Sequence, residues 1–273
     1  MIKPQLQFFL TDSKIHTVAS SACVLPPPEN HIYEVFRVIS GVALFLEDHL
    51  QRLQTSMSEA YIHCDVKILQ KDISTLISLN QHTSGNIKII FWKTNDIVHN
   101  MIFYDVHLYP AKEHFQNGIV VGTMQHERKH PNVKLYDSEM RSDALKLINN
   151  NNYNEVLLIS TDGYITEGSR SNIFFIQKNS IFTTPSDLVL EGVTRKRIIS
   201  IIRANGLNFH EKKIHVTDLK DYESIFLTGT SRRVLPVRRI EPYAFDFNVS
   251  HPVLRNLQEW FIVLCKDYID SKR

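Results

Sequence analysis

A chain reversal between two apolar runs constrains this sequence most strongly, because it sets a carboxylate beside a glycine where two strands meet. Residues 155–160 are typical of a buried strand, residues 162–163 are an Asp-Gly hairpin pair, and residues 172–177 are again apolar. Glu167 and Gly168 therefore fall at a strand end, and the glycine has no Cβ to keep a flat ligand from the backbone. Strand ends at tight turns hold reactive groups rigidly and within reach of ligands, so we expect a ligand site here.

Two further turns suit an anion. Residues 192–194, Gly-Val-Thr, lead into a helix predicted over 196–205, whose isoleucines recur at helical spacing. A helix start offers unpaired N–H groups and partial positive charge, which suits a phosphate. Residues 229–231, Gly-Thr-Ser, follow an apolar strand at 224–228, and successive small residues present amides and hydroxyls to an anion.

The run Thr-Glu-Gly-Ser-Arg-Ser-Asn-Ile-Phe at 166–174 resembles the signature of the fold-type IV pyridoxal phosphate enzymes, also called class IV aminotransferases. This family contains branched-chain aminotransferases, D-amino acid aminotransferases and aminodeoxychorismate lyases. The resemblance implies pyridoxal 5'-phosphate as the cofactor, with Glu167 facing its pyridine nitrogen. A carboxylate there keeps the nitrogen protonated, so that the ring withdraws electrons from the substrate carbon.

The resemblance also implies a catalytic lysine. Lys134 lies between the strand predicted at 118–123 and the helix before the hairpin, where the family has the lysine that holds the cofactor aldehyde as a Schiff base and moves the α-proton. Five residues on, many relatives have a tyrosine and this chain has Glu139, so the support of the cofactor's ring hydroxyl stays open. By resemblance the phosphate contacts are Arg52, Gly192, Val193, Thr194 and Thr230.

Substrate contacts match the family less closely. The candidates are His31, Tyr33, Lys93, Ser231 and Arg232. Residues 26–31, Pro-Pro-Pro-Glu-Asn-His, replace the family's Gly-Asp-Gly turn, so substrate entry there is expected to differ. The strand at 87–93 carries Trp-Lys where D-amino acid aminotransferases have an arginine for the substrate carboxylate. Lys93 or Arg232 is the alternative counter-charge, and a solvated surface cation is the competing interpretation of each.

A second motif in the sequence suggests a metal site. Residues 126–130, His-Glu-Arg-Lys-His, match the zinc-protease pattern, which requires both histidines on one face of a helix. Here the motif follows a strand-like run, and Pro131 disfavours helical geometry at His130. We therefore interpret the segment as a polar connection and expect no metal site.

Composition and charge favour an ordinary enzyme of two domains. The 273 residues are 43% hydrophobic, which suffices for real cores, and a net charge of +2 without a basic stripe argues against a nucleic-acid partner. Three cysteines without metal spacing suit a reducing cytosol, and no apolar run is long enough to cross a bilayer. We therefore expect a cytoplasmic protein with no membrane partner.

A polar, proline-bearing stretch at 109–117 predicts a linker between a small N-terminal α/β domain at 1–108 and a larger domain at 118–273. The resemblance implies an α+β fold in which the larger domain contains a pseudo-barrel of strands and binds the cofactor. It also implies a homodimer.

The family resemblance favours an aminotransferase that moves an amino group between an amino acid and a 2-keto acid. Gly-Ser after Glu167 and the Tyr-Glu-Val-x-Arg strand at 33–37 resemble that branch. An aminodeoxychorismate lyase, which forms 4-aminobenzoate and pyruvate, is the alternative, and a cofactor-binding protein without turnover is the lesser one. The donor, the acceptor and the stereoisomer stay open.

Overall fold

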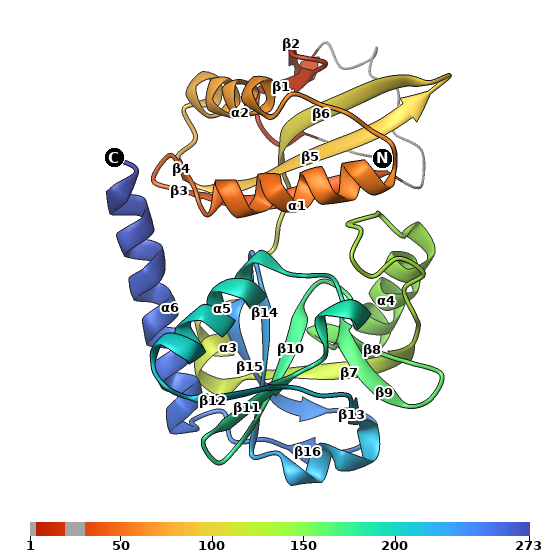
Figure 1. Cartoon of the computed structure of the whole chain (residues 1–273), viewed down its shortest axis with the longest axis vertical. Coiled ribbons are helices and arrows are strands. Elements are labelled where there is room, and N and C mark those ends of the chain that lie inside the picture. Colours follow the sequence, from red (N-terminus) through yellow and green to blue (C-terminus); the bar gives the residue numbers. More distant parts are fainter. Residues whose placement is uncertain (1–3, 20–30) are drawn as a thin grey trace. The chain divides into compact units, whose positions relative to one another are not determined.

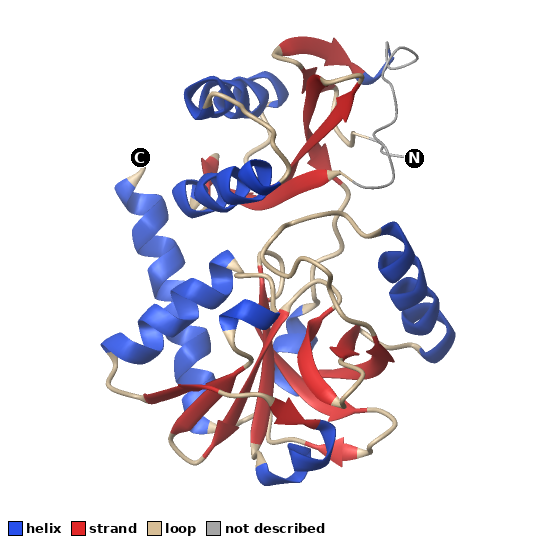
Figure 2. Ribbon diagram, turned by 45° about the vertical axis from the view of Figure 1, so that its right-hand side comes forward, coloured by secondary structure: helices blue, strands red, loops and turns tan. Residues whose placement is uncertain are grey.

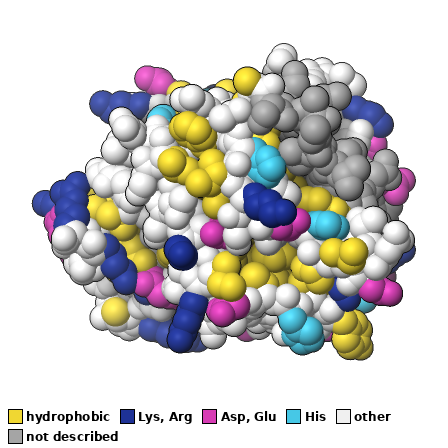
Figure 3. All heavy atoms as spheres, turned by 90° about the horizontal axis from the view of Figure 1, so that it is seen from above, with side chains coloured by type: hydrophobic (Ala, Val, Ile, Leu, Met, Phe, Trp, Pro, Cys, Tyr) yellow, Lys and Arg dark blue, Asp and Glu magenta, His cyan; other side chains and the backbone are white. Residues whose placement is uncertain are grey.

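The computed structural model describes residues 4–19 and 31–273, and the prolines at 26–28 lie outside the described residues. In the described part of the chain, no helix combines the length and the apolar character needed to span a bilayer. On the face drawn in Figure 3, Lys and Arg side chains are interspersed with Asp and Glu.

The chain divides into two compact units. One contains Met1–Leu108, Val133–Asp137 and Lys266–Arg273, and the other contains Tyr109–Asn132 and Ser138–Cys265. Residues 109–117, which we expected to be a linker, instead include the helix α3 (Lys112–Asn117) and belong to the second unit. The segment with Lys134, expected within the large domain, groups with the first unit because Leu135 bridges to Ile32 there.

The first unit is built on a six-stranded antiparallel sheet with the strand order β2-β1-β6-β5-β3-β4 (Figure 1). Its strands are β1 (Phe8–Thr11), β2 (Lys14–Thr17), β3 (Ile32–Ile39), β4 (Val42–Ala43), β5 (Gly85–Thr94) and β6 (Ile97–Asp105). The helices α1 (Leu46–Glu59) and α2 (Val66–Asn80) lie on the same side of these strands (Figure 2). Both helices are amphipathic, and their apolar stripes pack on the sheet face that carries Phe36, Ile87, Ile89 and Phe91.

The other face of the same sheet carries a separate aromatic cluster. Successive side chains of a strand point to opposite faces, so Tyr33 and Ile90 lie opposite to Phe36 and Ile89. The cluster consists of Phe9, Tyr33, Ile90, Trp92, Met101 and Phe103, with Val35 and Tyr136 packed against it.

The second unit contains a ten-stranded sheet with the order β12-β11-β10-β14-β15-β7-β8-β9-β13, and β16 pairs with β15. The strands are β7 (Ile119–Gln125), β8 (Glu155–Ile159), β9 (Tyr164–Gly168), β10 (Asn172–Gln177), β11 (Ser180–Thr183), β12 (Asn208–Glu211), β13 (Ile214–His215), β14 (Ser224–Gly229), β15 (Arg233–Ile240) and β16 (Phe245–Asp246). This sheet curls into a half-barrel (Figure 1), which confirms the predicted α+β fold with a pseudo-barrel of strands.

Helices and short turns complete the second unit. The helices are α4 (Ser138–Asn151), α5 (Val193–Ala204) and α6 (Pro252–Ser271), and the 3-10 turns are η2 (Ser186–Leu188) and η3 (Val216–Asp221). The residues of α6 from Lys266 onward group with the first unit. Inside the half-barrel, the core contains the inward apolar side chains of β8, β10, β14 and β15, among them Leu157, Phe175 and Leu227.

Candidate active site

Lys134 lies on a short extended segment that runs beside β3. Its backbone N–H donates to Ser56 Oγ at 3.0 Å, and its carbonyl accepts from the N–H of Tyr33 at 3.1 Å. The N–H of Tyr136 donates to the carbonyl of His31 at 2.8 Å, so the segment is held at both ends. The Nζ of Lys134 lies 4.6 Å from the ring centroid of Tyr33, which places its amine against an aromatic face.

Three rings surround this lysine segment. His31 stacks on Tyr136 with centroids 4.8 Å apart, and Tyr33 meets Tyr136 edge-on at 5.9 Å. His31 and Tyr33, both expected at the substrate site, are therefore brought together beside Lys134. Lys88, which the sequence analysis did not select, places its Nζ 5.3 Å from the Tyr136 ring and 5.5 Å from the Tyr33 ring. The available signal was a charged residue within the apolar strand at 87–92.

Lys93 does not share this face. The register of β5 puts it opposite Val98, with Phe91 two residues before it on the face that α1 and α2 cover. Its Nζ donates to the carbonyl of Tyr61 at 2.6 Å. The structure therefore separates Lys93 from Tyr33, although both were candidates for the substrate site.

Arg52, on α1, is held by a buried carboxylate. Its Nε donates to Glu34 Oε2 at 3.0 Å and its Nη2 donates to Oε1 at 2.6 Å, a two-pronged pair. His49 Nδ1 lies 2.9 Å from Glu34 Oε1. Sequence analysis missed both Glu34 and His49, although a glutamate within the apolar run at 32–39 was a signal.

The electrostatics of this cluster follow from its burial. Burial raises the pKa of Glu34, but the charge of Arg52 and the hydrogen bonds from His49 and Arg52 outweigh it and hold the pKa well below its ordinary value. Burial lowers the pKa of His49. The hydrogen bond to Glu34 and the charge of Glu34 raise it, but they do not offset the effect of burial. The charges of Arg52 and Lys134 lower the pKa of His49 further.

In the second unit, Glu167 lies at the buried end of β9. Its side chain forms an ion pair with Arg128, and the side-chain amide of Asn172 lies 3.4 Å from its Oε2. The same amide donates to the carbonyl of Leu190 at 2.8 Å. Only 3% of the surface of Glu167 is exposed. A cation and an amide therefore hold its carboxylate in place.

Gly168 leaves no room for a side chain inside the hairpin. A Cβ there would lie 2.2 Å from Ser171 Oγ and 3.3 Å from Glu155 Cγ. The glycine therefore permits close packing inside the hairpin, and the predicted approach of a flat ligand stays a prediction.

The His-Glu-x-x-His segment is not helical. It follows the end of β7 as irregular structure, so His126 and His130 do not share a helical face. Glu127 accepts hydrogen bonds from the N–H and hydroxyl of Thr161, and Arg128 pairs with Glu167. Within residues 4–19 and 31–273, no cluster of three or more His, Cys, Asp or Glu side chains is placed to hold a metal ion.

Helix α5 begins at Val193 with Gly192 as its N-cap, where the sequence predicted a phosphate site. Its cap has no side-chain hydrogen bond and its first turn contains no acid, so the N-terminal amides face no side-chain carboxylate from that turn. Val193 and Thr194 are buried. A Cβ on Gly192 would lie 2.1 Å from Asn172 Oδ1, so the glycine brings the helix start against the amide that also contacts Glu167.

The cations of the same turn are engaged elsewhere. Arg195 is 1% exposed and its Nη2 donates to the carbonyl of Thr184 at 3.0 Å and to Glu211 Oε1 at 2.6 Å. Lys196 pairs with Glu191 at 2.8 Å on the surface. Arg195 and Lys196 are therefore each paired with a carboxylate of the second unit.

The turn at 229–231 connects β14 to β15. Thr230 is half-buried and Ser231 is 6% exposed. The next residue, Arg232, places its Nη2 2.5 Å from Oε2 of the buried Glu155. Burial raises the pKa of Glu155, but Arg232 and the hydrogen bond from Ser169 hold it below its ordinary value. Arg232, a candidate for the substrate carboxylate, is thus already paired with a carboxylate of its own unit.

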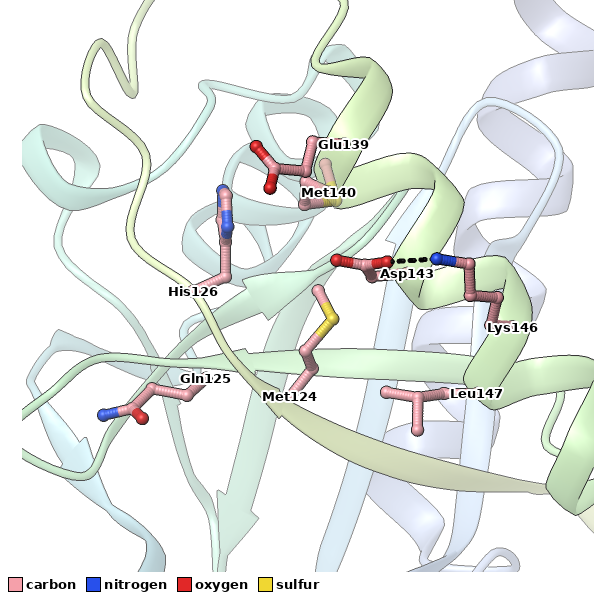
Figure 4. A pocket seen from close by; sticks show the side chains of 8 residues that line it. All are labelled: Met124, Gln125, His126, Glu139, Met140, Asp143, Lys146 and Leu147. Carbon is pink, nitrogen blue, oxygen red and sulfur yellow. Dashed lines mark hydrogen bonds and ion pairs between the residues drawn. The ribbon is translucent and has the colours of Figure 1, made fainter.

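A cavity of 570 Å³ lies elsewhere in the second unit, between the end of β7 and α4 (Figure 4). It is lined by Met124, Gln125, His126, Glu139, Met140, Asp143, Lys146 and Leu147. None of the residues expected to bind the cofactor lines it. Asp143 and Lys146 form an exposed ion pair at its edge (Figure 4).

Comparison with known proteins places the chain in a family. Residues 31–240 match the family model described as amino-transferase class IV. The chain is 26% identical over 245 residues to a D-alanine aminotransferase from Bacillus licheniformis, which covers 83% of this chain and 84% of the relative. It is 25% identical over 226 residues to a probable branched-chain-amino-acid aminotransferase from Rickettsia bellii, covering 77% of this chain and 78% of the relative.

A solved structure shows the same fold. The Escherichia coli branched-chain amino acid aminotransferase superposes with a TM-score of 0.84 at 18% identity, covering 96% of this chain and 95% of that one. The family match spans most of the chain and includes Lys134, Glu167 and both anion turns. The chain therefore belongs to the class IV aminotransferase family, and it is a pyridoxal phosphate-dependent aminotransferase.

Proposed function

We propose that this protein transfers the amino group of an amino acid to a 2-keto acid, with pyridoxal 5'-phosphate bound covalently to Lys134. The observation that carries this proposal is the place of the Lys134 amine, 4.6 Å from the Tyr33 ring centroid, on a segment pinned by Ser56. An amine held at an aromatic face is positioned for one partner and shielded from solvent on that side.

The residues of each unit fit this cofactor. In the second unit, the start of α5 has no side-chain cap and no first-turn acid, which suits a phosphate at Gly192, Val193 and Thr194. Glu167 is buried and fixed by Arg128 and Asn172, as a carboxylate facing a pyridine nitrogen must be. Thr230 and Arg52 are the further phosphate contacts that the resemblance to the family implies, a hydroxyl and a guanidinium.

Bound there, pyridoxal phosphate supplies an electron-withdrawing ring that stabilises negative charge on the substrate carbon when its proton is lost. Lys134 moves that proton, because an amine released from its covalent partner acts as a general base and then as a general acid. Glu167 provides the negative charge that favours a protonated ring nitrogen. Arg128 and Asn172 hold the Glu167 carboxylate in a fixed orientation. Glu34 likewise fixes the orientation of the Arg52 guanidinium.

In this proposal the residues beside Lys134 contact the substrate. Tyr33 and His31 flank the lysine, and we assign them to substrate contact. The resemblance to the family adds Ser231 as a further substrate contact. The substrates are amino acids and 2-keto acids, in accord with the family.

We further infer a cytoplasmic homodimer with no nucleic-acid or membrane partner. The two described cysteines, Cys64 and Cys265, are free thiols, as is usual in a reducing compartment. The dimer is inferred from the resemblance to the family. The net charge of +2 gives little attraction to nucleic acid.

The visible absorbance of the purified protein tests this function. We expect a yellow protein whose band shifts when an amino acid is added and returns when a 2-keto acid is added. A Lys134→Ala variant should show neither change. Pyruvate release from aminodeoxychorismate without amino transfer to any 2-keto acid would replace the transaminase by a lyase, and a band that no amine moves would leave a binding protein.

A further inference from the structure

Lys88 occupies the sheet face that carries the proposed catalytic lysine. On β5, Lys88 pairs with Val35 of β3 and with Phe103 of β6, and Ile90 pairs with Tyr33. Because side chains two residues apart share a face, Lys88 stands next to the Tyr33–Ile90 pair. The neighbours of Lys88 are therefore apolar or aromatic on three sides. Arg37 and Asp105, which both pair with Asn86, stand on the side of Lys88 away from Tyr33.

The ammonium group of Lys88 lies between two rings that also define the surroundings of Lys134. Its Nζ is 5.5 Å from the Tyr33 centroid and 5.3 Å from the Tyr136 centroid. The Nζ of Lys134 is 4.6 Å from the same Tyr33 ring. One aromatic ring thus contacts both amines, and Lys88 adds positive potential within reach of a molecule that reacts at Lys134.

The other cations considered for the substrate do not have this placement. Lys93 lies on the opposite face of β5 and donates to Tyr61. Arg232 is paired with the buried Glu155 at 2.5 Å. Among these three residues, only Lys88 shares a ring with Lys134.

We propose that Lys88 binds a carboxylate of the substrate, and that it selects amino acids over amines that lack a carboxylate. This inference rests on the proposed transaminase function of Lys134. An ammonium set among Val35, Phe103 and two tyrosine rings is partly withdrawn from water, which strengthens its attraction for a carboxylate. The carboxylate is either the α-carboxylate that every amino acid carries or the side-chain carboxylate of an acidic amino acid.

The test is a Lys88→Met variant, which keeps an unbranched stem between the rings and removes the charge. Three donors are compared in single-turnover spectra: alanine, glutamate and 1-phenylethylamine. We expect the apparent dissociation constant of a carboxylate donor to rise about 10- to 100-fold, which is the loss of one charged hydrogen bond, with the limiting rate of the half-reaction little changed. The amine without a carboxylate should be unaffected.

The pattern across donors separates the two carboxylates. Equal losses with alanine and glutamate identify the α-carboxylate, and a loss with glutamate alone identifies the side-chain carboxylate. A Lys88→Arg variant should recover most of the preference, because it restores the charge. Lys71→Met, an exposed lysine on α2, is the matched control and should behave as the wild type.

A binding measurement separates this inference from the function on which it rests. Calorimetry with 2-oxoglutarate should show weaker binding to Lys88→Met than to the wild type, even if no turnover is seen. Equal binding by both proteins, or equal losses with all three donors, contradicts the role of Lys88. Failure of the wild type to respond to any donor, with the binding difference intact, contradicts the transaminase function and leaves the carboxylate site standing.

Discussion

The guanidinium of Arg52 and the carboxylate of Glu34 form a buried two-pronged ion pair, with Nε to Oε2 at 3.0 Å and Nη2 to Oε1 at 2.6 Å. Glu34 is fully buried and the Arg52 side chain is 9% exposed. Removal of one partner from such a pair leaves the other charge without compensation in a poorly hydrated place.

Glu34→Gln should therefore destabilise the protein. We expect the free energy of unfolding in denaturant to fall by about 3 kcal/mol or more, the usual cost of breaking a buried pair. Glu47→Gln, which breaks the exposed pair with Lys272, is the control and should cost less than about 1 kcal/mol. Equal effects of the two substitutions would show that burial of the first pair has no energetic consequence.

Such pairs explain why sequence predicted some parts of this protein and not others. The Glu167 hairpin and the start of α5 were predicted because turn residues and apolar periodicity are local signals. The pairs Arg52–Glu34 and Arg232–Glu155 were not, because they join elements whose contact depends on the register of the sheet or on helix packing. For the same reason, sequence analysis did not place Lys88 beside Tyr33. The alternation of side chains along β5 can be read from the sequence, but the pairing of β5 with β3 cannot.

The stability of the protein should depend on pH through His49. Its pKa is lowered on folding, mainly by burial, so the unfolded chain binds a proton more readily than the folded one. Stability is then full above the ordinary pKa of 6.5 and falls as pH drops below it, until the folded group also titrates.

Denaturant unfolding between pH 7.5 and 5.5 measures this effect. We expect the free energy of unfolding to decrease toward pH 5.5, and His49→Gln to flatten the decrease. The pKa of Glu34 is also lowered, so its contribution is retained down to its ordinary value of 4.5 and is lost below that, as pH falls toward its folded pKa. An unchanged slope in His49→Gln would assign the acid sensitivity of this range to another group.

Glu167→Gln should impair catalysis. The substitution keeps the shape and removes the charge that favours a protonated ring nitrogen, so kcat should fall roughly 100- to 1,000-fold, as for the loss of one preorganised electrostatic group. Stopped-flow spectra of the first half-reaction give the rate. Glu167→Asp, which retains the charge at a shorter reach, should recover part of it, and a Gln variant as fast as the wild type would contradict the assignment.

Gly192→Ala should weaken cofactor binding. A Cβ at this position would lie 2.1 Å from Asn172 Oδ1, so the amide must leave its place between Leu190 and Glu167. We expect the Kd for pyridoxal phosphate, measured by absorbance titration, to rise by about 10-fold or more, since a misplaced helix start loses charge-assisted contacts to the phosphate. Ser200→Ala, on the exposed side of the same helix, should leave the Kd unchanged. Equal Kd values for the two variants would mean that the α5 start does not bind the phosphate.

The most direct test of the whole account is the identity of the residue that carries the cofactor. The purified protein is reduced with borohydride in the presence of pyridoxal phosphate and digested, and the labelled peptide is sequenced by mass spectrometry. We predict that the label lies on Lys134 and on neither Lys88 nor Lys129. A label on either of those lysines, or the absence of any label, would contradict the account.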